Sequence, residues 1–193
     1  MVDSASQLRL TDPRALRAVA HPVRLALVGL LRHEGPLTAT EAAARLGESP
    51  ASCSFHLRQL AKYGFVEEAG GGRGRRRPWR ATAMFTSWPA FSDEPELAAA
   101  TELLTTVIAE RYLENLVSWL AAKPEEPREW QAAELVGDAG IFVTAEELQA
   151  LGKSVEALVA PYLERTTKPE LRPGDARLVT FINLAFPVVG ERR

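Results

Sequence analysis

The sequence predicts a mainly α-helical protein with small β elements, in which a helix-rich first part is followed by one long helix and a mixed α+β part. Helix start signals recur before residue 50, where Asp12 and Ser49 each precede a proline and Thr38 precedes Glu41 by three residues. Apolar residues recur every three or four positions over residues 96–120. Strand-type residues are confined to short runs.

Composition limits the class of protein. The chain has 193 residues, of which 46% are hydrophobic and 25% charged, as in ordinary globular proteins. We find no apolar run of the ~18 residues that a membrane span needs, and no secretory leader pattern at the start. The single cysteine, Cys53, cannot form an internal disulfide. We therefore expect a cytoplasmic protein without membrane contact.

Charge is distributed unevenly along the chain. Residues 1–82 hold 13 Lys and Arg against 7 Asp and Glu, a net charge of +6, whereas residues 83–193 hold 10 against 18, a net charge of −8. This asymmetry predicts that only the first part meets a polyanion.

Residues 1–11 read as a flexible arm, and residues 12–82 as a compact domain. Four helices are expected, over residues 13–19, from Pro22 to before Gly35, from Thr38 to before Gly47, and from Ser49 to before Gly64. Two short strands, residues 65–69 and 78–82, flank a Gly- and Arg-rich loop at residues 70–77.

The third and fourth helices are separated by only three residues, which is typical of a helix-turn-helix. The second helix of such a motif enters the major groove of DNA, and a basic loop can bind the backbone or minor groove. Each feature alone has a simpler explanation. The Gly- and Arg-rich loop could be merely solvated, and the short turn could join two helices of an ordinary bundle. The residues expected to contact double-stranded DNA are Ser49, Ala51, Ser52, Cys53, Ser54, His56, Arg58, Lys62, Arg73, Arg75, Arg76, Arg77 and Arg80. For Cys53, a role as a small core residue is favoured over a DNA contact. For His56, an orienting role at the helix surface is nearly as well supported as a DNA contact.

Residues 12–82 resemble the winged helix-turn-helix of the ArsR-like transcriptional regulators. The similarity lies in Ala15-Leu-Arg-Ala-Val-Ala-His-Pro-Val-Arg-Leu-Ala-Leu27, in Ser49-Pro-Ala-Ser-Cys-Ser-Phe-His-Leu-Arg-Gln-Leu60 and in Gly64-Phe-Val66. The resemblance implies a homodimer on an inverted-repeat operator, usually a repressor released by a signal. The family's metal-ligand motifs are missing, so we expect neither a metal nor another cofactor.

Beyond a linker at residues 83–95, a long helix is expected over residues 96–122. Its apolar stripe is too wide for the small first domain to cover, so we expect it to form a dimer interface, although packing on its own chain is an alternative. The expected interface residues are Leu97, Leu104, Ile108, Leu113, Leu116 and Leu120.

Residues 123–193 are expected to form an α+β domain. Strands are favoured at residues 130–136, where a helix is also compatible, and at 141–143 and 177–187. A helix begins at the capping box of Thr144 and is kinked or shortened at Pro161. Its aromatic residues could line a pocket for a small apolar effector, although a plain core is favoured: Trp130, Phe142, Tyr162, Phe181 and Phe186.

No catalytic constellation is found, so an enzyme is not expected. Two functions remain. The first is a dimeric DNA-binding regulator, and the alternative is a protein-interaction scaffold built on the same fold without an operator of its own.

Overall fold

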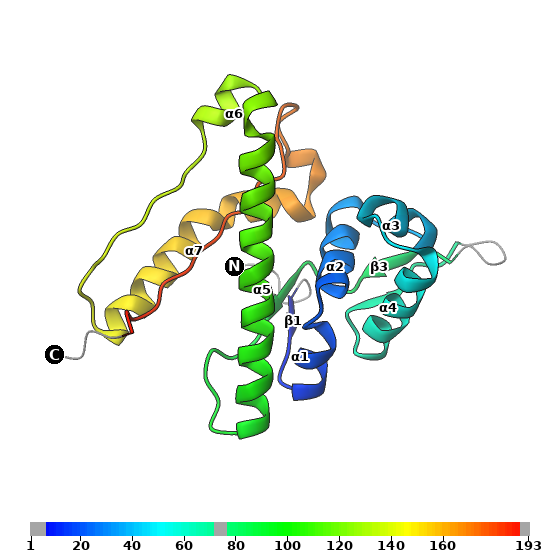
Figure 1. Cartoon of the computed structure of the whole chain (residues 1–193), viewed down its shortest axis with the longest axis horizontal. Helices are drawn as coiled ribbons and strands as arrows, with labels where there is room; N and C mark the ends of the chain where they lie inside the picture. The colour runs from blue at the N-terminus through cyan, green and yellow to red at the C-terminus, as the bar shows by residue number, and fades with distance from the viewer. Residues whose placement is uncertain (1–6, 72–76, 190–193) are drawn as a thin grey trace. The chain divides into compact units, whose positions relative to one another are not determined.

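The computed structural model describes residues 7–71 and 77–189, and the chain divides into two compact units, residues 1–117 and 118–193. The described chain is mainly helical with short strands, which confirms the predicted class (Figure 1). The division falls inside the long helix α5 (Pro95–Ala122).

Four helices of the first unit lie where the sequence predicts them: α1 (Pro13–Val19), α2 (Pro22–Glu34), α3 (Ala39–Leu46) and α4 (Pro50–Lys62). The start of each is fixed locally. The Asp12 side chain accepts from the backbone N–H of Arg14 at 2.8 Å, and Thr38 and Glu41 form a complete capping box. Gly47 ends α3 with φ +68°, a conformation that favours glycine and turns the chain into α4.

Two small sheets complete the first unit. Strand β2 (Val66–Glu68) pairs antiparallel with β3 (Trp79–Ala81), as the predicted hairpin requires. The Trp79 backbone also exchanges hydrogen bonds of 2.8 and 3.0 Å with Leu37, which ties the hairpin to the entry of α3. The second sheet was not predicted: β1 (Gln7–Arg9) lies parallel to β4 (Phe85–Ser87). Residues 7–9 therefore belong to a sheet and not to a flexible arm.

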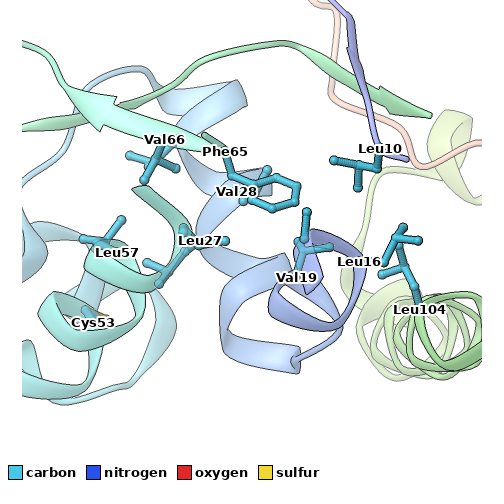
Figure 2. Close-up of a cluster of buried hydrophobic side chains, with 14 of the residues drawn as sticks. Leu10, Leu16, Val19, Leu27, Val28, Cys53, Leu57, Phe65, Val66 and Leu104 are labelled. Carbon is cyan, nitrogen blue, oxygen red and sulfur yellow. The ribbon is translucent and has the colours of Figure 1, made fainter. Parts of the chain in front are cut away.

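The core of the first unit gathers apolar side chains from all of its helices and from the hairpin. Figure 2 shows Leu27, Leu57 and Phe65 around its centre, and Leu104 of α5 pointing toward Leu16 of α1. Burial lowers the pKa of Arg32 to about 10. Its guanidinium stays charged at neutral pH and donates to the Ala83 carbonyl at 2.9 Å, which holds α2 against the chain before β4.

The first half of α5 belongs to this core, which corrects part of the predicted dimer interface. Leu97 and Leu104 are 9% and 1% exposed within the single chain, and Ile108 packs against the same cluster. These side chains are covered by their own unit. Leu113 and Leu120 are exposed, and Leu116 is half-buried.

The regular secondary structure in the described part of the second unit is helical. The prediction of strands in this unit is therefore wrong. Its described residues form the end of α5, the short 3-10 helices η2 (Lys123–Glu125) and η3 (Pro169–Leu171), and the α-helices α6 (Arg128–Ala132) and α7 (Ala145–Thr167). Residues 130–132 are helical, and residues 141–143 and 177–187 form no strand. Strand-type residues form strands only where a partner supplies hydrogen bonds, and none lies beside these segments in the described chain. Pro161 does not shorten α7, which continues to Thr167.

Candidate nucleic-acid interface

Helix α4 has one face in the core and one on the surface. Ser49 caps its start by accepting from the Ser52 N–H at 3.1 Å, and Pro50 occupies the first turn, where no donor is needed. The core face holds Cys53, Leu57 and Leu60, all 0% exposed. The surface face is a stripe with spacings of four and three residues, which we call the α4 stripe: Ala51, Phe55, Arg58 and Lys62.

The residues of α4 that were predicted to contact DNA differ in how exposed their side chains are. Ser49, Ala51, Arg58 and Lys62 are exposed, whereas Ser52, Ser54 and His56 are half-buried at the edges of the stripe. Cys53 is fully buried, so its side chain cannot contact DNA. This corrects its place among the expected contact residues and agrees with the favoured alternative of a small core residue. Burial, more than nearby Glu48, raises the pKa of the Cys53 thiol and keeps it protonated.

The sequence did not identify Phe55 as a surface residue, because an apolar residue in an amphipathic helix is expected to face the core. It is 48% exposed in the middle of the α4 stripe. Its spacing from Ala51 and Arg58, four and three residues, was the available signal. An exposed aromatic ring there can contact a thymine methyl group in the major groove.

A groove of about 460 Å³ lies between the start of α3, helix α4 and the hairpin. Arg58 and Ser54 line it from α4, Thr40 from α3 and Arg77 from the hairpin. Thr40 is exposed in the first turn of α3, where backbone N–H groups favour an anion. Sequence reasoning missed this position, since it had assigned the residues around it only to helix capping.

The hairpin arginines within the described residues are paired with acids of the opposite strand. Arg77 donates to Glu68 at 3.1 Å, and Arg80 lies 2.8 Å from Glu67. Both pairs are exposed and are worth about 0–1 kcal/mol, so a phosphate can displace the glutamates at low cost. The other predicted arginines of this loop, Arg73, Arg75 and Arg76, lie outside the described residues.

A cluster of two histidines and an arginine joins α2 to α4. Arg24 Nε donates to His56 Nδ1 at 3.2 Å, and Arg24 Nη1 donates to the Ala18 carbonyl at 2.5 Å. His21 Nδ1 accepts from the Val23 N–H at 3.2 Å, and the two imidazole rings are 4.6 Å apart. Burial, followed by the neighbouring His21 and Arg24, lowers the pKa of His56. The hydrogen bond from Arg24 to His56 and the ring contact with His21 therefore tie the start of α2 to α4 and fix the orientation of α4.

Comparison with known proteins agrees with this geometry. Residues 19–69 match a family described as a helix-turn-helix domain, and the match covers α2, α3, α4 and β2. It supports a DNA-binding role for the first unit. No curated protein matches the chain.

Two searches of the described residues concern other kinds of site. No group of three or more His, Cys, Asp or Glu side chains there could hold a metal ion. Within the same residues, no helix combines the length and apolar character needed to cross a bilayer.

Proposed function

We propose that the protein is a sequence-specific, DNA-binding transcriptional regulator that acts as a homodimer on an inverted-repeat operator and represses transcription. The observation that carries this proposal is the α4 stripe, which lies on the second helix of the matched helix-turn-helix and ends in two cations. An α-helix with its side chains is about 10–12 Å across, so the 13-residue helix α4 can lie in a major groove about 12 Å wide.

The stripe suggests a division of roles. Arg58 can bind the O6 and N7 acceptors of guanine, and Phe55 can contact a thymine methyl group, so both would read sequence. Lys62, Thr40 and the hairpin arginines would contact phosphates and set the position of the protein on the duplex. A homodimer would place two α4 helices on half-sites about one helical turn apart.

The first experiment is genome-wide mapping of the sites that the intact protein occupies, followed by anisotropy titrations on a mapped duplex and on a scrambled duplex. The proposal predicts enriched inverted repeats and affinity at least 1,000-fold above that for the scrambled sequence. Equal, weak binding to both duplexes would contradict it and favour the scaffold alternative.

A salt titration tests the hairpin separately. Replacement of Arg73, Arg75 and Arg76 by Gln should lower the slope of log affinity against log salt by about 2.7, at about 0.9 for each phosphate contact. An unchanged slope would remove the hairpin from the interface. As a single-charge control, Arg17→Gln should leave the slope unchanged, because Arg17 lies on α1 and belongs neither to the α4 stripe nor to the hairpin.

A further inference from the structure

The second unit exposes its apolar side chains, and its described residues form no core. Over residues 118–166 and 168–189, none is buried. Seventeen of the 22 large hydrophobic side chains that the described chain exposes lie in this unit. A soluble monomer rarely exposes more than a few hundred Å² of contiguous apolar surface, and a domain needs a buried core. The apolar side chains of the second unit therefore need a cover from outside this unit.

The carboxyl-terminal segment, residues 178–186, is the most apolar part of this surface. It is rich in β-branched and aromatic residues and carries no helix signal. Pro187 ends it, because proline has no N–H for a ladder. Leu178, Val179 and Phe181 are all exposed, and so is Phe186 at 76%. Neighbouring residues of an extended chain point to opposite sides, so both sides of the segment are apolar and open.

Helix α7 supplies a second apolar surface in the same unit. Leu151, Leu158 and Tyr162 follow one another by seven and four residues, which places them on one face of the helix. All three are exposed in the single chain. A helix with such a stripe is stable in water only when the stripe packs against another element.

We propose that residues 178–186 pair as a β-strand with the same segment of a second copy, and that the apolar faces of the two α7 helices cover this strand pair. The proposal rests on the homodimer of the proposed function and gives it a contact surface. A two-fold axis through the segment pairs it antiparallel with its counterpart, so each strand gains a hydrogen-bonding partner. The second unit thus completes its core only in the dimer.

Area and charge agree with a second copy as the partner. At roughly 200 Å² for each aromatic side chain, the exposed fractions of Tyr162, Phe181 and Phe186 alone offer about 400 Å². This is half of the ~800 Å² that each partner buries in a standard interface. Residues 118–193 hold 9 Lys and Arg against 12 Asp and Glu, so two copies repel each other only weakly.

The test compares two phenylalanines in the full-length chain by sedimentation equilibrium. Phe186 and Phe91 are 76% and 77% exposed, but Phe91 lies in the first unit, between β4 and α5. Phe186→Asp should raise the dimer dissociation constant at least tenfold, and Phe91→Asp should leave it unchanged. Equal dissociation constants for the two variants, a monomeric wild type, or aggregates without defined stoichiometry would overturn the proposal.

Hydrogen exchange supplies a second readout that needs no variant. The amides of residues 178–186 should be protected at concentrations where the dimer forms and should lose protection on dilution. Exchange at the rate of an unstructured chain at every concentration would overturn the strand pairing. The result is independent of DNA: dissociation by Phe186→Asp upholds the dimer contact even if no operator is found, and loss of operator binding in the α4 variants leaves it untouched.

Discussion

The place of Leu104 in the core of the first unit gives a prediction that can be worked out in magnitude. Leu104 is 1% exposed and the adjacent Leu103 is 46% exposed on the same helix. Leu104→Ala removes a fully buried side chain and should lower the free energy of unfolding of the first unit by about 3 kcal/mol. Leu103→Ala, the matched control, should cost about 1 kcal/mol at most.

Cys53 allows the first unit to be followed by itself. It is the only cysteine of the chain and is fully buried in the same cluster as Leu104. A maleimide pulse at increasing urea concentration therefore labels only chains whose first unit has unfolded. With a slope near 2 kcal/mol per M, Leu104→Ala should lower the labelling midpoint by about 1.5 M. Equal midpoints for Leu103→Ala and Leu104→Ala would refute the assignment of α5 to this core.

Three further predictions concern α4. Phe55→Ala should weaken binding to a mapped operator about tenfold in an anisotropy titration, a cost within the ~1–3 kcal/mol of a lost base contact. Its urea midpoint should stay near that of the wild type. Equal affinities of the variant and the wild type would contradict a base contact. Because the pKa of His56 is lowered on folding, the unfolded chain takes up a proton first as the pH falls through about 6.5. The free energy of unfolding should therefore decrease from pH 7.5 to 5.5 more steeply in the wild type than in His56→Gln, and parallel pH curves would contradict this. Cys53→Ala should keep operator affinity within twofold, because the thiol faces the core; affinity that depends on the Cys53 redox state would disprove it.

The helices of the first unit could be predicted because their signals are local. The cap at Asp12, the capping box of Thr38 and the left-handed Gly47 each fix an end through neighbouring residues. The hairpin followed from its flanking strand residues. The sheet of β1 and β4 could not be predicted, because it joins segments almost 80 residues apart and neither carries a strong strand pattern.

Side-chain exposure was harder to predict than the elements themselves. The spacing of Leu97, Leu104 and Leu113 shows one apolar stripe, but it does not say where along α5 the cover of the same chain ends. Phe55, which the apolar pattern of α4 places near the core, is exposed, whereas Cys53 takes the core position that was its favoured alternative. Periodicity alone does not place each residue of a short amphipathic helix. The strands predicted in the second unit do not form in the described residues, because strand-type residues form a strand only where a partner supplies hydrogen bonds, and residues 130–132 are helical instead.

The most direct test of the DNA-binding surface is the affinity of Arg58→Gln for a mapped operator, measured by anisotropy beside Arg17→Gln. Both variants remove one exposed positive charge, but only Arg58 belongs to the α4 stripe. We expect Arg58→Gln to lose about 5- to 150-fold in affinity, the equivalent of ~1–3 kcal/mol for a guanine contact, and Arg17→Gln to bind like the wild type. Equal affinities of the two variants would contradict the account.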